Sequence, residues 1–146
     1  MKHFVALFAL ALVACAGVPA QTTAKQGETM TAPAAQSLLG TEWLLEDLGG
    51  RGVLDRVEAT LAFPEAGRVT GNGSCNRFTG SVEIDGGTIR FWQVASTRRA
   101  CVPAVMDQEA KYLKALEGAE RVAMEGPWLL IYSKGLEKPL RFTRKA

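Results

Sequence analysis

Two short segments of the chain hold the residues that could do chemistry. The first, from Gly71 to Gly80, reads G-N-G-S-C-N-R-F-T-G, and the second, from Ala95 to Cys101, reads A-S-T-R-R-A-C. Each segment carries one of the two cysteines that lie beyond the N-terminal region, Cys75 and Cys101. We expect the two segments to meet in space.

The two cysteines allow three interpretations. In an oxidising compartment, a pair of cysteines favours a single disulfide between Cys75 and Cys101. A reactive thiol is the alternative, because Cys101 directly precedes a predicted helix and lies beside Arg98 and Arg99, which favour the thiolate. Two separately buried thiols are the third interpretation.

The same segments gather polar side chains that could bind a small anion or a partner. Arginine suits bidentate recognition of a carboxylate or a phosphate. The alternatives are structural: asparagine suits left-handed turns and caps backbone groups, and the arginines suit solvated charge or ion pairs with Glu65, Glu83 or Asp107. The candidate binding residues are Asn72, Asn76, Arg77, Ser96, Thr97, Arg98 and Arg99.

Several kinds of catalytic site find no support in the sequence. The only histidine, His3, lies in a predicted signal peptide, which excludes histidine-based catalysis and histidine-ligated metals in the mature chain. Asp107 and Glu109 are two residues apart on a predicted helix and do not face each other as an acid–base pair. The G-N-G-S run lacks the spacing and lysine of a P-loop. We predict no catalytic residue, no metal and no cofactor.

The N-terminal residues predict a lipoprotein. Residues 1–14 have a charged head and an apolar run too short to span a bilayer, as in a secretory signal peptide. The run ends Leu12-Val13-Ala14-Cys15, which resembles a bacterial lipobox, so we expect Cys15 to carry the lipid. Ala16 stands where aspartate would signal retention in the inner membrane, which favours the outer membrane, facing the periplasm. A soluble secreted protein cut after Ala20 is the alternative.

The rest of the chain divides into a tether and one domain. Residues 15–37 are rich in Ala, Thr, Gln and Pro and hold no aromatic residue, which predicts a flexible tether. Residues 38–146 suffice for one domain with one core. The formal charge of the full chain is only +2, which gives no argument for nucleic-acid binding. We expect a monomer whose partners are the membrane, through the N-terminal lipid, and an envelope protein or small ligand.

The domain is predicted to be mainly β. Apolar alternation predicts about eight strands, over residues 38–48, 57–63, 68–71, 78–84, 89–91, 121–124, 128–133 and 140–143. In the first strand, Trp43, Leu45 and Asp47 share one face. Because the connections are short, the strands should pair antiparallel. We therefore expect a curved antiparallel sheet or a small β-barrel, within the α+β class, with one helix packed against it.

A single helix is predicted between Pro103, which suits a first turn, and Gly118, which suits a C-terminal stop. The residues predicted at helical spacing on one face are Met106, Ala110, Leu113 and either Leu116 or Glu117. The three tryptophans are interpreted as core residues, with the lining of a ligand pocket as the alternative; they are Trp43, Trp92 and Trp128.

Four sequence blocks resemble the META/HslJ-like domain family. They are G-T-E-W-L-L from Gly40, F-P-E-A-G-R-V-T-G-N-G-S-C-N-R-F-T-G from Phe63, A-S-T-R-R-A-C from Ala95 and Q-E-A-K-Y-L-K-A-L from Gln108. Ser74 departs from the family pattern, where glycine or another small residue is expected. The resemblance implies a β-barrel-like fold with one helix, often presented on lipoproteins. The family includes the heat-inducible HslJ, linked to novobiocin resistance, and implies no catalytic residue.

These observations lead to one main hypothesis and two alternatives. We expect a non-enzymatic envelope lipoprotein whose binding or stress-protection domain is tethered in the periplasm, with a link to heat or novobiocin-type drug tolerance. The first alternative is a small-molecule carrier with an internal barrel cavity lined by Trp and Phe. A thiol oxidoreductase is disfavoured, because the sequence contains no C-x-x-C and the mature chain no histidine.

Overall fold

The structure is a computed structural model that describes residue 33 and residues 35–146. The predicted signal peptide, Cys15 and nearly all of the predicted tether lie outside the described residues. The tether prediction ended at residue 37, whereas a short helix already begins at Ala35 and buries Leu38. The folded part of the chain therefore starts slightly earlier than predicted.

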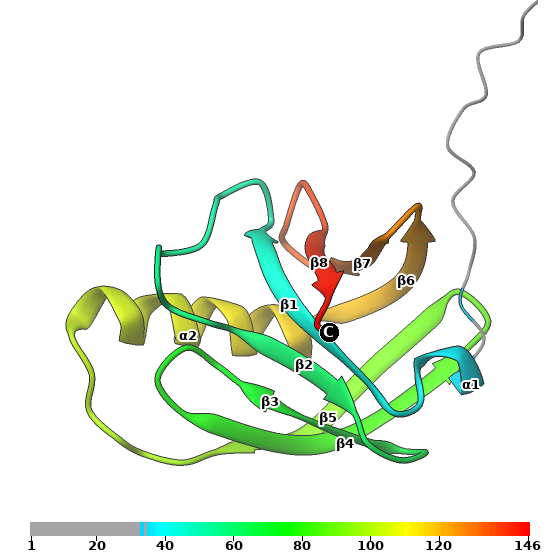
Figure 1. Cartoon of the computed structure of the whole chain (residues 1–146), viewed down its shortest axis with the longest axis horizontal. Helices are drawn as coiled ribbons and strands as arrows, with labels where there is room; N and C mark the ends of the chain where they lie inside the picture. The colour runs from blue at the N-terminus through cyan, green and yellow to red at the C-terminus, as the bar shows by residue number, and fades with distance from the viewer. Residues whose placement is uncertain (1–32, 34) are drawn as a thin grey trace, which may run out of the picture.

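The described residues form eight strands and two helices, and the strands close into an antiparallel barrel in which neighbours in sequence are neighbours in space (Figure 1). Strand β8 pairs with β1 to complete the ring. The predicted mainly β fold is confirmed, and the sheet is closed rather than open. The elements are α1 (Ala35–Leu38), β1 (Thr41–Leu48), β2 (Thr60–Phe63), β3 (Arg68–Asn72), β4 (Arg77–Asp85), β5 (Thr88–Ser96), α2 (Pro103–Glu117), β6 (Ala119–Glu125), β7 (Trp128–Ser133) and β8 (Leu140–Arg144).

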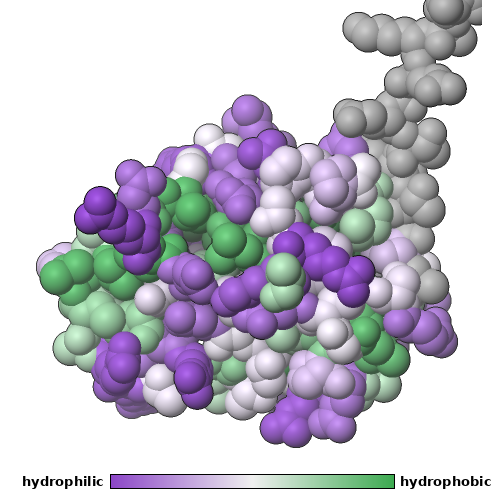
Figure 2. All heavy atoms as spheres, viewed as in Figure 1, coloured by the Kyte–Doolittle hydropathy of each residue, from purple (hydrophilic) through white to green (hydrophobic). Residues whose placement is uncertain are grey.

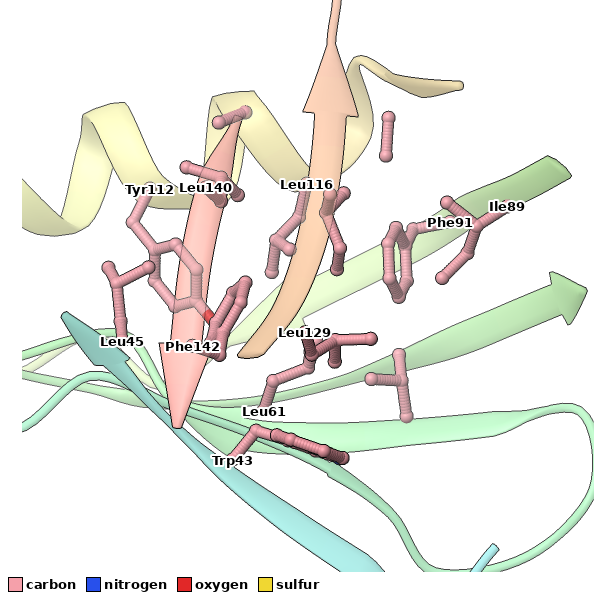
Figure 3. Close-up of a cluster of buried hydrophobic side chains, with 14 of the residues drawn as sticks. Trp43, Leu45, Leu61, Ile89, Phe91, Tyr112, Leu116, Leu129, Leu140 and Phe142 are labelled. Atoms are coloured by element: carbon pink, nitrogen blue, oxygen red, sulfur yellow. The ribbon is translucent and has the colours of Figure 1, made fainter. Parts of the chain in front are cut away.

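Apolar side chains fill the interior of the barrel (Figure 3). They come from alternate positions of the strands, because successive side chains of a strand point to opposite faces of the sheet. Each large apolar side chain that is removed from water contributes about 1.5–3 kcal/mol. The innermost residues, all at most 2% exposed, include Leu45, Leu61, Phe63, Ile89, Leu129, Ile131, Leu140 and Phe142.

A β-bulge in β1 changes the face that was predicted for Asp47. The pairing with β8 shifts register between Leu45 and Asp47, so the alternation that buries Trp43 and Leu45 resumes at Leu48. Asp47 is only half-buried, and its carboxylate accepts a hydrogen bond from the backbone N–H of Gly50 in the turn that follows. The prediction that Asp47 continues the inner face is therefore wrong, because an extra residue in one strand reverses the alternation.

The buried face of helix α2 matches the prediction only in part, since Leu116 is buried as predicted and Leu113 packs against the core. Met106 and Ala110 are exposed and Leu113 is half-buried. The buried face holds Gln108, Glu109, Tyr112, Ala115 and Leu116. Figure 3 shows Tyr112 and Leu116 directed from the helix into the barrel core. Gln108 and Glu109 are thus buried, whereas Met106 and Ala110, which apolar periodicity predicted to face the core, are exposed.

Only one of the three tryptophans belongs to the core. Trp43 is 3% exposed, and its indole N–H donates to the hydroxyl of Thr41 at 2.7 Å. Trp92 is 43% exposed, because it follows the inward-facing Phe91 and points to the outer face. Trp128 is half-buried on the outside of β7. The core interpretation is confirmed for Trp43 and wrong for the other two.

The contact between β2 and β3 is short and unusually close. Their register contains one pair, Ala62 with Thr70. Beyond it, the backbone N–H of Asn72 donates to the hydroxyl of Thr60 at 3.1 Å. A Cβ added at Gly71 would lie 2.1 Å from the Thr60 carbonyl oxygen, so only glycine lets the two strands approach here. The loop that carries Cys75 begins directly after this contact, where β3 ends at Asn72.

Candidate functional site

The two chemistry-bearing segments meet, as predicted. Cys75, in the β3–β4 loop, and Cys101, before α2, form a disulfide with an S–S distance of 2.04 Å and Cα atoms 6.0 Å apart. The disulfide prediction is confirmed, and the free-thiol alternatives are wrong. The bond joins a loop at one end of β4 to the segment that enters the helix.

A buried carboxylate from α2 holds the β3–β4 loop in place. Glu109 is 6% exposed, and its Oε2 accepts hydrogen bonds from the backbone N–H groups of Cys75 at 2.9 Å and Asn76 at 2.6 Å. Its Oε1 accepts a third bond, from Nδ2 of Asn76, at 2.8 Å. A Cβ added at Gly73 would lie 2.8 Å from Oε2, so the loop closes tightly around the carboxylate. Three N–H donors replace the water that burial removes.

Asn76 is the centre of this polar network. It is 2% exposed, and its Nδ2 donates to Glu109 and also to the carbonyl oxygen of Arg99 at 3.2 Å. Its Oδ1 accepts from the hydroxyl of Thr97 at 2.9 Å and from the backbone N–H of Arg99 at 2.7 Å. All its hydrogen-bonding capacity is used within the protein. Asn76 therefore joins segment 97–99 to the β3–β4 loop and has no donor left for a ligand.

Gln108, the neighbour of Glu109, holds two further loops. Its Oε1 accepts from the backbone N–H of Leu54 at 2.7 Å, and its Nε2 donates to the hydroxyl of Ser74 at 3.0 Å. Ser74 has a φ of 125°, a conformation that side chains rarely adopt and that explains the glycine expected there. The bond from Gln108 gives the serine a role in the loop that glycine could not take.

Tyr112 connects the network to the core. It is fully buried, its hydroxyl donates to the carbonyl oxygen of Thr60 at 3.0 Å, and its ring packs edge-on against Phe78 at 6.0 Å. Burial raises the pKa of the Tyr112 hydroxyl well above its ordinary value of 10.0. Gln108, Glu109 and Tyr112 lie on one edge of α2. This face of the helix turns inward because the partners of their hydrogen bonds lie in the loops and strands of the barrel.

Four of the seven predicted binding residues line one surface pocket of about 490 Å³. They are Asn72, Arg77, Thr97 and Arg99, and Cys75 lies beside them. Asn76 lies beneath, buried in the network described above. Ser96 and Arg98 are exposed but do not line the pocket.

The pocket retains hydrogen-bond donors. Arg77 has no side-chain partner among the described residues, and Arg99 uses one N–H, which donates to the carbonyl oxygen of Cys75 at 3.2 Å. The Oδ1 of Asn72 accepts from the backbone of Ser74 at 3.2 Å, which leaves its amide N–H groups available. The arrangement therefore presents two guanidinium groups and an amide to a single depression, which is the donor set that an oxyanion requires.

Two of the three acidic residues considered as ion-pair partners of these arginines pair with other basic residues instead. Glu65 pairs with Arg68 at 3.1 Å, and Asp107 pairs with Lys111 at 2.6 Å. Glu83 has no ion pair with Arg77, Arg98 or Arg99 among the described contacts. Arg77, Arg98 and Arg99 therefore form no ion pair among the described residues.

Gln108 and Glu109 were missed as members of the site. The sequence offered one signal, since both residues stand in the Q-E-A-K-Y-L-K-A-L block that carries the family resemblance. Glu109 was considered only as a partner of Asp107. The structure directs Glu109 into the protein and Asp107 to its surface.

Comparison with known families agrees with the geometry. The sequence model of the META domain matches residues 36–146, which is most of the chain. The chain belongs to the META domain family. The match spans the whole barrel and both segments of the site, and the predicted resemblance is confirmed.

Two solved structures share the fold of this META domain. One NMR structure is 24% identical, with a TM-score of 0.63, and the match covers 76% of this chain and 94% of the other. The NMR structure of a protein from Burkholderia xenovorans is 23% identical, with a TM-score of 0.64, and the match covers 88% of this chain and 99% of the other. A search of curated proteins found no match.

Neither helix in the described part of the chain has the length and apolar character that crossing a bilayer requires. No group of three or more His, Cys, Asp or Glu side chains in the same part of the chain is arranged to hold a metal ion.

Proposed function

We propose that this META domain protein is a non-enzymatic binding protein of the bacterial envelope. Its pocket at Arg77 and Arg99 would bind an anionic group of an envelope protein or a small ligand, without a cofactor. The protein would act as a monomer, without nucleic acid.

One observation supports the proposal above all: Arg77 and Arg99 keep N–H donors without a partner and line a pocket whose backbone is cross-linked by the disulfide. The disulfide, Glu109 and Asn76 fix the backbone around the pocket. A pre-formed site loses less conformational freedom when it binds, so a small number of donors suffices for useful affinity. Arg77, which has no side-chain partner among the described residues, is the donor that this scaffold leaves for a ligand.

The proposal places the protein at the outer membrane, facing the periplasm, with Cys15 lipidated. A tether over residues 15–34 would let the domain reach partners at a distance from the bilayer. The disulfide is consistent with an oxidising compartment. We propose that binding contributes to tolerance of heat or of novobiocin-type drugs.

The test has two measurements on the protein from its native membranes and one on a deletion strain. Intact mass should show a lipid on Cys15 and a disulfide that reduction opens. Cross-linking and pull-down with wild type should recover an envelope component that Arg77→Gln with Arg99→Gln does not recover. Arg98→Gln is the matched control, since Arg98 is exposed but lies outside the pocket. Equal recovery by all three proteins, together with unchanged drug and heat sensitivity in a deletion strain, would exclude the proposal.

The internal-carrier alternative has no observation in its favour. Tyr112, Leu61 and Phe142 are packed together in the space that a ligand would need (Figure 3). An apolar fluorescent probe should therefore leave the emission of the buried Trp43 unchanged.

A further inference from the structure

Exposed apolar side chains lie beside the arginine pocket. Val102 is 65% exposed, Met106 37% and Leu54 38%. Figure 2 shows hydrophobic side chains gathered at the end of the molecule where α2 begins and where the β1–β2 loop passes, while the rest of this view is a mixture of hydrophilic, neutral and some hydrophobic side chains. We call Leu54, Val102 and Met106 the apolar strip.

The apolar strip belongs to the same rigid unit as the pocket. Val102 directly follows the disulfide cysteine Cys101 and is three residues from Arg99, so their Cα atoms are at most about 11 Å apart. Met106 lies one helical turn further on, and its backbone N–H donates to the Val102 carbonyl oxygen at 3.2 Å. The Cα atoms of Arg99 and of the first apolar residue are therefore no farther apart than the ends of a four-residue extended peptide.

Leu54 is fixed to this unit by Gln108. The side chain of Gln108 accepts from the backbone N–H of Leu54 and donates to Ser74, the residue before Cys75. The helix thus holds the apolar loop and the pocket loop at once. Exposed apolar groups held in a fixed place next to unpaired cations form a surface of mixed character, which suits a ligand of the same mixed character.

We propose that this surface binds a peptide segment of a partner protein in which a carboxylate side chain is flanked by apolar side chains. The carboxylate would accept hydrogen bonds from Arg77 and Arg99, and a flanking apolar side chain would cover Val102 and Met106. The inference rests on the proposed anion-binding function and adds the class of ligand. A peptide fits better than a bilayer surface, because the donors line a concave pocket that a flat surface cannot enter.

The experiment measures the affinity of three short peptides for the purified full-length protein by calorimetry. The parent probe is acetyl-Gly-Leu-Glu-Phe-Gly-amide; in the second peptide Gln replaces Glu, and in the third Ser replaces both Leu and Phe. We expect the parent peptide to bind at least about tenfold more tightly than either altered peptide, since each loses one half of the recognition. Inorganic phosphate and vesicles of phosphatidylglycerol are the competing anions.

Surface variants locate the binding. Arg77→Gln with Arg99→Gln should weaken the parent peptide about tenfold or more, and Val102→Ser about threefold or more, because each change removes one half of the contact. Arg98→Gln and Leu136→Ser are matched controls, since Arg98 lies outside the pocket and Leu136 is exposed in the β7–β8 loop. Neither control should change affinity more than about twofold.

The outcomes separate this inference from the proposed function. If the Ser-flanked peptide or phosphate binds at the arginines as tightly as the parent peptide, the peptide inference is wrong and anion binding stands. Binding of vesicles that requires Arg77, without binding of the parent peptide, also overturns the inference. If none of the anions binds in an arginine-dependent way, both the inference and the anion-binding function fail.

Discussion

Two regions of the barrel present arginines in opposite ways. On the outer face of β6–β8, the guanidinium of Arg121 lies over the ring of Tyr132 at 4.2 Å and that of Arg141 over the ring of Trp128 at 4.6 Å. At the disulfide corner, Arg77 forms no ion pair and no cation–π contact among the described residues. The guanidinium groups of Arg121 and Arg141 are thus packed against aromatic rings of the same sheet, whereas the guanidinium of Arg77 has no partner in the described part of the chain.

The comparison also shows where each region gets its rigidity. The outer face of β6–β8 rests on regular strand pairing, with Arg121 directly opposite Tyr132. At the disulfide corner the pairing of β3 with β4 ends at Asn72 and Arg77, and a side chain of α2, Glu109, holds the backbone of the loop beyond it. A residue buried under the corner should therefore matter more for stability than the arginines that lie on top of it.

Removal of the Glu109 carboxylate should have the largest effect. Glu109→Ala leaves the N–H groups of Cys75 and Asn76 buried without an acceptor, and we expect a loss of about 3–5 kcal/mol in the free energy of unfolding. Urea unfolding followed by tryptophan fluorescence measures the loss. Glu117→Ala, an exposed residue of the same helix, should change stability by less than about 0.5 kcal/mol. A small effect of Glu109→Ala would mean that the disulfide and the hydrogen bonds of Asn76 with segment 97–99 hold the corner without the carboxylate.

Opening of the disulfide should have the next largest effect. Cys75 and Cys101 are 26 residues apart, and cross-linking a loop of this size stabilises a protein by about 3–4 kcal/mol. The double variant Cys75→Ser with Cys101→Ser should lose this amount against wild type in the same urea series. If wild type under reducing conditions is as stable as it is when oxidised, the network of Glu109 and Asn76 suffices without the bond.

Tyr112→Phe should give a smaller effect that depends on pH. At neutral pH the loss of the hydrogen bond to Thr60 should cost about 1 kcal/mol. Because burial raises the pKa of Tyr112 above 10.0, the neutral hydroxyl stabilises the folded state fully below pH 10, and this stabilisation is lost as the pH rises further. Urea unfolding at pH 7 and at pH 11 should therefore show a smaller alkaline loss in the variant than in wild type. Equal alkaline losses would show that other groups control the high-pH limit.

The smallest effects on stability are expected for the arginines, and they should distinguish Arg121, which packs on an aromatic ring, from Arg77, which has no partner among the described residues. Arg121→Gln removes a cation–π contact and should cost about 0.5–1 kcal/mol, without any change in anion binding. Arg77→Gln should leave stability within about 0.5 kcal/mol of wild type and weaken anion binding. Thermal unfolding and an anion titration on both variants provide the comparison. If Arg77→Gln destabilises as much as Arg121→Gln, Arg77 is a structural residue and the contrast between the two regions fails.

The strands could be predicted from the sequence because burial on one face imposes a period of two residues. Ile89 and Phe91 on β5 illustrate this, since these buried residues alternate with exposed neighbours and their pattern needs no knowledge of distant contacts. Closure of the sheet could not be predicted, because the pairing of β8 with β1 depends on the total twist of all strands. The bulge before Asp47 was missed for a similar reason, since it appears only when β8 is placed alongside.

The site was predictable in its position but not in its construction. The cysteines, Arg77 and Arg99 stand out by residue type, whereas Glu109 is one of several acidic residues on a short helix. Its role follows from three N–H donors supplied by residues more than 30 positions earlier in the chain. No local pattern reports such a contact, and the same contact turned α2 away from the face that Met106 and Ala110 predicted.

The pairing of β1 with β8 also determines when the barrel can close during synthesis of the chain. The ring lacks its last member until β8 has been made, and the backbone N–H of Lys145, just after β8, still has to reach the carbonyl oxygen of Glu42. A nascent chain therefore carries β1 with one side unpaired through most of its synthesis. If the chain leaves the cytoplasm through a narrow channel, N-terminus first, the barrel can close only on the far side, after β8 has emerged.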